Sequence, residues 1–109
     1  MDEIVKRIEM LEFHQQLMIS MLNTNGREFD YLIIKKRLSK QEVDDFFMLC
    51  EEMNKKRETQ KADQFVFYTP LFNEFKEKIH SNLPVEETIN ACLKQNIYSE
   101  LMMLLKKNL

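Results

Sequence analysis

The number of glycines limits the folds open to this chain of 109 residues more than any other sequence feature, because the chain has only one, Gly26. Proteins contain about 7% glycine on average, so about seven would be ordinary at this length. Hairpins and β-bulges use residues with positive φ, which glycine adopts at little cost. Rossmann and P-loop nucleotide sites need several glycines close together. The sequence therefore argues against a multi-stranded β fold and excludes both nucleotide-binding loops.

Length and apolar content predict a single domain over residues 1–109, since hydrophobic residues make up 44% of the chain and single domains cluster at about 100–150 residues. Two cysteines are too few for a disulfide scaffold. The charged N-terminus lacks the apolar stretch of a signal peptide. The longest wholly apolar run, residues 101–105, is far shorter than the about 20 residues of a membrane span. We therefore expect a cytoplasmic protein that does not associate with membranes.

The strongest helical pattern covers residues 2–22, where apolar residues recur at alternating spacings of three and four. That spacing is the a/d seam of three heptads. An ordinary amphipathic helix would lay such a stripe on the core of its own domain. Here Val5 and Ile19 widen the stripe on one side and Met21 on the other, which favours self-association as a dimer or trimer. The predicted oligomer interface is Ile4, Ile8, Leu11, Gln15, Met18 and Leu22.

Polar Gln15 at an a position would fix the register of such an assembly. The helix is predicted to stop at residues 23–26, where asparagine and Gly26 tolerate the left-handed conformation of a C-cap.

The rest of the chain is predicted to be helical as well. The clearest boundary is a capping box, in which Ser39 and Glu42 satisfy each other's backbone amides. Thr69 and Pro70 resemble the N-cap and first residue of another helix. The predicted fold class is all-α, a multihelical array or bundle of about five to six helices. The further helices are expected over residues 27–37, 39–62, 70–81, 85–94 and 98–107.

One segment near residues 64–69 departs from the helical pattern. It contains β-branched and aromatic residues without helical spacing, which predicts a short extended segment. Two interpretations stay open: a connector whose rings fill the core, or an exposed edge that binds a ligand or peptide.

Residues that could carry catalysis or bind a metal are few. His14 and His80 are expected at the surface or its boundary, and Cys50 and Cys92 lie on apolar helical faces typical of core cysteines. Glu77 and His80 form one Glu-x-x-His motif, whereas a di-iron bundle needs two such motifs and two further glutamates. No cofactor or metal is therefore expected, and a metal-dependent or Cys/His enzyme is the least favoured function.

Two basic runs raise the alternative of a small nucleic-acid-associated regulator. They cover residues 35–40 and 55–61. The helix that would enter DNA, however, begins with Glu42, Asp44 and Asp45, whose carboxylates would face phosphates. The net charge of −2 also argues against a dedicated nucleic-acid binder. The basic runs are expected to be solvated helix ends and an exposed helical tail.

Several segments along almost the whole chain together resemble one family. These segments are Glu28–Leu32, Leu38–Val43, Leu49–Lys56, Thr69–Leu71, Val85–Ile89 and Gln95–Tyr98. The chain resembles the YhaI-like proteins of Bacillus and relatives, which are small helical proteins of unknown function. The resemblance implies an all-α fold, a Gram-positive cytoplasm and an oligomer, and it brings no catalytic residues. The leading hypothesis is a non-enzymatic, self-associating helical module that acts through protein contacts.

Overall fold

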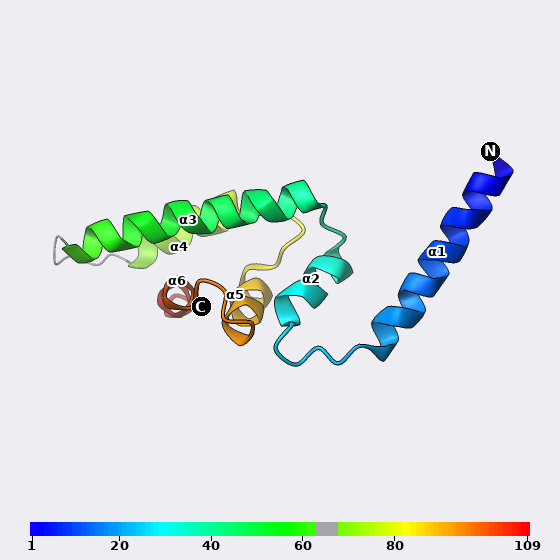
Figure 1. Ribbon diagram of the computed structural model, residues 1–109. Helices are drawn as coiled ribbons and strands as arrows, with labels where there is room; N and C mark the ends of the chain where they lie inside the picture. The colour runs from blue at the N-terminus through cyan, green and yellow to red at the C-terminus, as the bar shows by residue number, and fades with distance from the viewer. Residues whose placement is uncertain (63–67) are drawn as a thin grey trace.

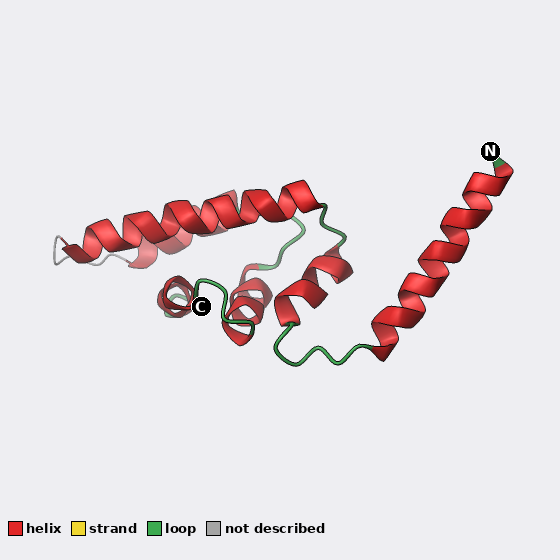
Figure 2. Cartoon of the chain, viewed as in Figure 1, coloured by secondary structure: helices red, strands yellow, loops and turns green. Residues whose placement is uncertain are grey.

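The computed structural model describes residues 1–62 and 68–109, and within them the chain forms six α-helices and no strand (Figures 1 and 2). The predicted all-α class is therefore confirmed. The predicted boundaries agree with the observed ones to within about three residues, and one helix matches at both ends. The helices are α1 (Asp2–Met21), α2 (Glu28–Lys36), α3 (Lys40–Ala62), α4 (Tyr68–Lys78), α5 (Val85–Lys94) and α6 (Ser99–Lys106).

The beginning of α4 differs from the prediction. Tyr68 and Thr69, which were assigned to the extended segment, lie in the first turn of α4, and Pro70 follows them in that turn. The physical reason is that proline is tolerated throughout the first helical turn, where its missing N–H has no intrahelical partner to lose. Proline therefore marks the start of a helix without deciding which residue comes first. Residues 64–67 of the predicted extended segment fall in the stretch that is not described.

Helices α2 to α6 form a packed unit, which we call the body. Helix α5 packs against α6 and α2, and α3 packs against α4 and α6. Stacked rings of Phe29 and Phe46, with centroids 5.3 Å apart, join α2 to α3. The ring of Phe75 on α4 meets Phe46 edge-on at 6.1 Å. Ile89 on α5 and Leu101 on α6 are fully buried and extend this core to the other end of the body.

The ends of the helices show how a chain with one glycine makes its turns. Gly26 has φ +80°, and a Cβ there would meet nothing within 4 Å, so glycine is favoured by the backbone conformation and not by space. Arg37 and Asn96 adopt left-handed conformations at φ 57° and 60° and end α2 and α5, as predicted for Asn96. The C-cap of α1, by contrast, is extended at Leu22, so the left-handed Gly26 lies four residues beyond the end of this helix and does not cap it.

The predicted capping box at the start of α3 is confirmed. The Ser39 amide donates to Glu42 Oε1 at 2.8 Å, and the Glu42 amide donates to Ser39 Oγ at 3.2 Å. The second oxygen of Glu42 pairs with Nε2 of His80, which follows α4. Hydrogen bonds from Ser39, followed by the bond from His80, hold the pKa of Glu42 below its ordinary value of 4.5. This carboxylate therefore ties the start of α3 to the end of α4.

We predict that Glu42→Gln removes part of the acid sensitivity of folding. Because the folded state lowers the pKa of Glu42, its stabilising contribution is present above about pH 4.5 and is lost as pH falls through the folded-state value. Urea unfolding at about pH 7 and about pH 3 should show a smaller loss of stability for the variant than for the wild type. Parallel losses in the two proteins would contradict this role, since Glu74, whose pKa is also lowered, is present in both.

Helix α1 stands apart from the body (Figure 1). Among the described residues, the extensive helix packings all join helices of the body, and none includes α1. The chain extends over 61 × 29 × 18 Å with a radius of gyration of 17.2 Å, whereas a compact domain of this length has about 13 Å. The interpretation of α1 as a helix that covers the core of its own domain is therefore wrong.

Candidate self-association interface

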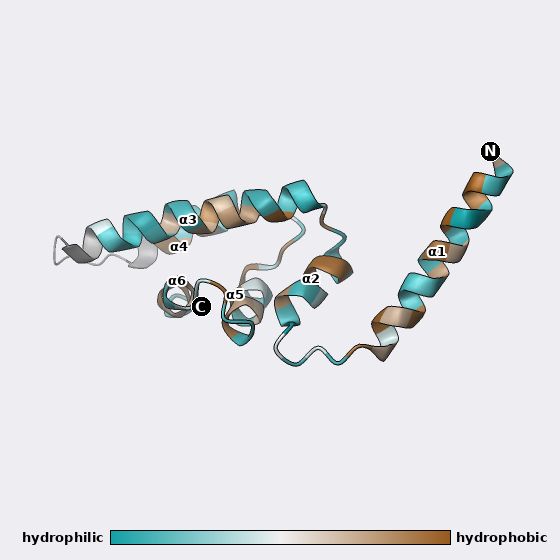
Figure 3. Ribbon diagram, in the orientation of Figure 1, coloured by the Kyte–Doolittle hydropathy of each residue, from teal (hydrophilic) through white to brown (hydrophobic). Residues whose placement is uncertain are grey.

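The predicted interface residues lie on one face of a helix that is exposed along its whole length. No residue of α1 is buried, and only Ile19 is partly covered. At 3.6 residues per turn, the six residues of the seam fall within about 80° of the helix circumference. Leu11 is 66% exposed and Ile8 is 48% exposed. Brown segments along α1 in Figure 3 mark these apolar positions. The seam is Ile4, Ile8, Leu11, Gln15, Met18 and Leu22.

A second apolar face lies on another side of α1, and no prediction from the sequence identified it. We call it the outer stripe, and its centre is about 135° around the helix from the centre of the seam. Its spacings of three, four and four residues could have identified it in the sequence. The seam has the longer apolar pattern, so the apolar face of this helix was assigned to the seam alone. Phe13 within it is 56% exposed. The outer stripe consists of Met10, Phe13, Leu17 and Met21.

A groove of about 570 Å³ separates the C-terminal half of α1 from the body. We call it the α1–α2 groove. On the α1 side it is lined by Glu12, Gln15, Gln16 and Ile19, so it adjoins the seam at Gln15. On the body side its apolar lining comes from the end of α2 and the residues after it. Those residues are Ile33, Ile34 and Leu38.

A family model described as "Protein of unknown function (DUF1878)" matches residues 1–109 of this chain. The chain belongs to the DUF1878 family. The match begins at residue 1, so α1 is part of the matched segment and not an addition to it. The family description carries no activity that could be transferred to this member.

The two cysteines of this DUF1878 protein are core residues, as predicted. Cys50 and Cys92 are both 0% exposed and neither forms a disulfide. Burial raises the pKa of both thiols, that of Cys92 to about 12, so they stay protonated and poorly nucleophilic at neutral pH. Their role is to fill space where α3 and α5 meet the rest of the core.

The two histidines belong to separate elements of the fold, α1 and the turn after α4. His14 is exposed on α1 beside the ring of Phe13, at 6.0 Å between centroids. His80 Nδ1 accepts a hydrogen bond from the Asn82 amide, within the turn after α4. His80 Nε2 pairs with Glu42, the capping residue of α3, so both ring nitrogens have structural partners. Glu77 of the Glu-x-x-His motif is exposed. Across residues 1–62 and 68–109, no three His, Cys, Asp or Glu side chains come together as a metal site.

The second basic run departs at Arg57 from the exposed tail that was predicted, while Lys55 is exposed as expected. Arg57 is only 9% exposed, its guanidinium lies 3.1 Å from Glu100 on α6, and its Nε donates to Asn54 Oδ1 at 2.9 Å. Lys56 pairs with Glu74 on α4. Arg57 lies four residues after buried Met53, so it continues the inward face of α3. Its aliphatic stem is buried while its charge is paired, which a count of basic residues cannot indicate.

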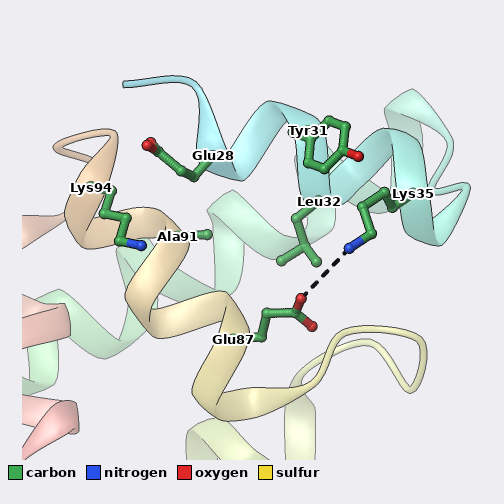
Figure 4. Close-up of a pocket in the computed structure, with 7 residues that line it drawn as sticks. All are labelled: Glu28, Tyr31, Leu32, Lys35, Glu87, Ala91 and Lys94. Carbon is green, nitrogen blue, oxygen red and sulfur yellow. Dashed lines mark ion pairs between the residues drawn. The ribbon is translucent and has the colours of Figure 1, made fainter. Parts of the chain in front are cut away.

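A small pocket lies between α2 and α5 (Figure 4). Its volume of about 190 Å³ is below the about 300–1,000 Å³ of typical ligand sites. Lys35 and Glu87 span it at 4.0 Å, and Glu28 and Lys94 add one more charge of each sign. The opposing charges largely balance, so the pocket has no electrostatic preference for an anion or a cation.

None of the helices in the described part of the chain is long and apolar enough to cross a bilayer.

Proposed function

We propose that this protein is a non-enzymatic helical module that self-associates through the seam of α1, as a dimer or trimer of parallel helices in register. The observation that carries the proposal is a helix of 20 residues with an apolar seam and no buried residue. In proteins most helical stability comes from the packing of an apolar face and not from intrinsic helix propensity. The body does not supply that packing, and a second copy of the chain would.

Charged residues on the flanks of the seam support a parallel orientation of the associated α1 helices. With Ile8 at an a position, Arg7 occupies g and Glu12 the following e. In a parallel coiled coil a g residue faces the next e residue of its neighbour, so Arg7 would meet Glu12 of the second copy. In an antiparallel pair g faces g and e faces e, and these two charges would not meet.

The polar residue within the seam supports the same orientation. In a parallel, in-register assembly Gln15 would face Gln15 of the neighbour, and each amide can both donate and accept a hydrogen bond. In an antiparallel pair it would face an apolar d residue and would be buried without a partner, which is costly. The a and d residues mix isoleucine, leucine and methionine, a combination that favours neither two nor three strands.

The mass of the wild-type protein tests the proposal directly. Sedimentation equilibrium at micromolar concentration should give two or three times the chain mass of 13.2 kDa. A mass of one chain across that range would overturn the proposal.

We also propose that this DUF1878 protein is one of the YhaI-like proteins. Its resemblance to the YhaI-like proteins of Bacillus is consistent with a cytoplasmic oligomer without catalytic residues. No contact in the described residues favours the alternative of a nucleic-acid-associated regulator, since Lys40 pairs with Asp44 at 3.6 Å and Arg57 faces inward.

A further inference from the structure

The C-terminal half of α1 contains a single ionisable side chain, His14. Between Glu12 and Arg27 every other residue is apolar or carries no charge. His14 occupies the g position directly before Gln15 of the seam, and it is exposed in the single chain. It lies about 80° around the helix from the centre of the seam and about 55° from the centre of the outer stripe. Protonation of His14 therefore places a charge between the two apolar faces of α1.

We infer that His14 makes self-association depend on pH: its neutral ring is compatible with the parallel assembly, and its protonated ring opposes it. Histidine is the side chain that ordinarily changes its charge between about pH 8 and about pH 5. This inference rests on the proposed self-association and adds a means of regulating it.

The neighbours of His14 on its own helix offer no carboxylate to a positive charge. Side chains three and four positions apart share a helix face, and for His14 all four of these are apolar. The ring of Phe13 lies 6.0 Å away between centroids, and this contact within one helix does not require a second copy. In the single chain water solvates the exposed ring, so its charge needs no partner. The four apolar neighbours are Met10, Leu11, Leu17 and Met18.

The neighbouring copy would bring an apolar side chain to this position. In a parallel coiled coil a g residue faces the next e residue of its neighbour, so His14 would meet Ile19. The e residue one heptad earlier is Glu12, which would pair with Arg7. Ile19 would therefore displace water from the ring of His14 without supplying a hydrogen-bond partner.

Charged groups on the body of the neighbouring copy act in the same direction. The α1–α2 groove places the body on the side of α1 that carries the e positions, and its charged lining residues from the body are Lys35 and Arg37. Glu87 partly neutralises Lys35, at 4.0 Å, and Arg37 adds a second cation. Together with Glu12, these are the charged groups on the flank that would face His14, and the carboxylate of Glu12 is already paired.

Covering the ring of His14 would thus remove water and offer no free carboxylate, which favours the neutral form. The assembly then binds the proton more weakly than the single chain does, so protonation promotes dissociation. The stabilising contribution is fully present near about pH 8 and is lost as pH falls toward about pH 5. Each assembly contains one His14 from every copy, so the losses of the individual copies multiply.

Sedimentation equilibrium at about pH 7.5 and about pH 5.5, at equal ionic strength, tests the inference in the full chain. The dissociation constant of the wild type should be at least about tenfold higher at the lower pH. His14→Gln keeps a neutral polar side chain, and its dissociation constant should change less than about twofold. His80→Gln is the matched control and should keep the response of the wild type, because His80 pairs with Glu42 within the body.

The inference and the proposed function fail in different ways. If the wild type assembles equally well at both pH values, or His14→Gln responds as the wild type does, the role of His14 is wrong and self-association stands. Tighter assembly of the wild type at the lower pH would also overturn that role, because the protonated ring would then pair with a carboxylate such as Glu12. The mass of one chain at both pH values would overturn both proposals.

Discussion

Replacing Ile8 and Leu11 together by glutamate is expected to weaken self-association at least about 100-fold. Each buried aliphatic side chain contributes about 1.5–3 kcal/mol, and each 1.4 kcal/mol is a factor of ten in the dissociation constant. Glutamate also places like charges opposite each other across the seam. Sedimentation equilibrium should show a single chain at concentrations where the wild type is assembled. Far-UV circular dichroism should retain the helical signal of the body, because neither side chain contacts its core.

Lys6→Glu is the matched control for this variant, because it changes the net charge by the same two units on the f face of the same helix. Its dissociation constant should stay close to that of the wild type. Equal effects of the two variants would mean that net charge, and not the seam, governs assembly. If the Ile8 and Leu11 variant assembles as strongly as the wild type, the interface lies on another surface.

Phe75→Ala is expected to lower the free energy of unfolding by about 3–5 kcal/mol, the usual cost of removing a buried phenylalanine ring. Phe75 is 0% exposed and meets Phe46 where α4 packs on α3, so its loss leaves a cavity that the rigid neighbours only partly fill. Denaturant unfolding in the background of the two seam substitutions measures the body alone, without a contribution from assembly.

Phe13→Ala in the same background is the comparison, since it makes the same chemical change on α1. Phe13 is 56% exposed, so we expect a change within about 0.5 kcal/mol, which is typical of surface substitutions. A loss for Phe13→Ala as large as that for Phe75→Ala would show that α1 folds as part of the body. That result would contradict the separation of the two parts on which the proposed interface depends.

Local signals in the sequence predicted much of the fold. The capping box at Ser39 and Glu42 was recognisable because its two hydrogen bonds join residues three positions apart. Proline at position 84 and asparagine at position 96 marked the two ends of α5, whose predicted range of 85–94 matches the observed one. Cys50 and Cys92 were assigned to the core from their places on apolar helical faces. These features depend on neighbours within one or two helical turns, which the sequence displays directly.

Features that depend on distant partners were predicted less well. Arg57 was assigned to an exposed basic tail, whereas it is buried on the inward face of α3 and pairs with Glu100, forty-three positions later. The outer stripe was not identified, because an apolar stripe has no assigned role until the surface opposite it is known. The α1–α2 groove could not be predicted at all, since it forms between residues of α1 and the corner after α2.

By itself, the sequence determined that this chain is helical, where most of its helices begin and end, and which side chains share the face of the seam. Only the tertiary structure decided whether that face is buried against its own core or left exposed. The physical reason is that periodicity places side chains on one side of a helix, while the direction of the chain through residues 22–27 places the helix itself. That direction carries α1 away from the body, so a seam that could have covered a core remains open along its whole length.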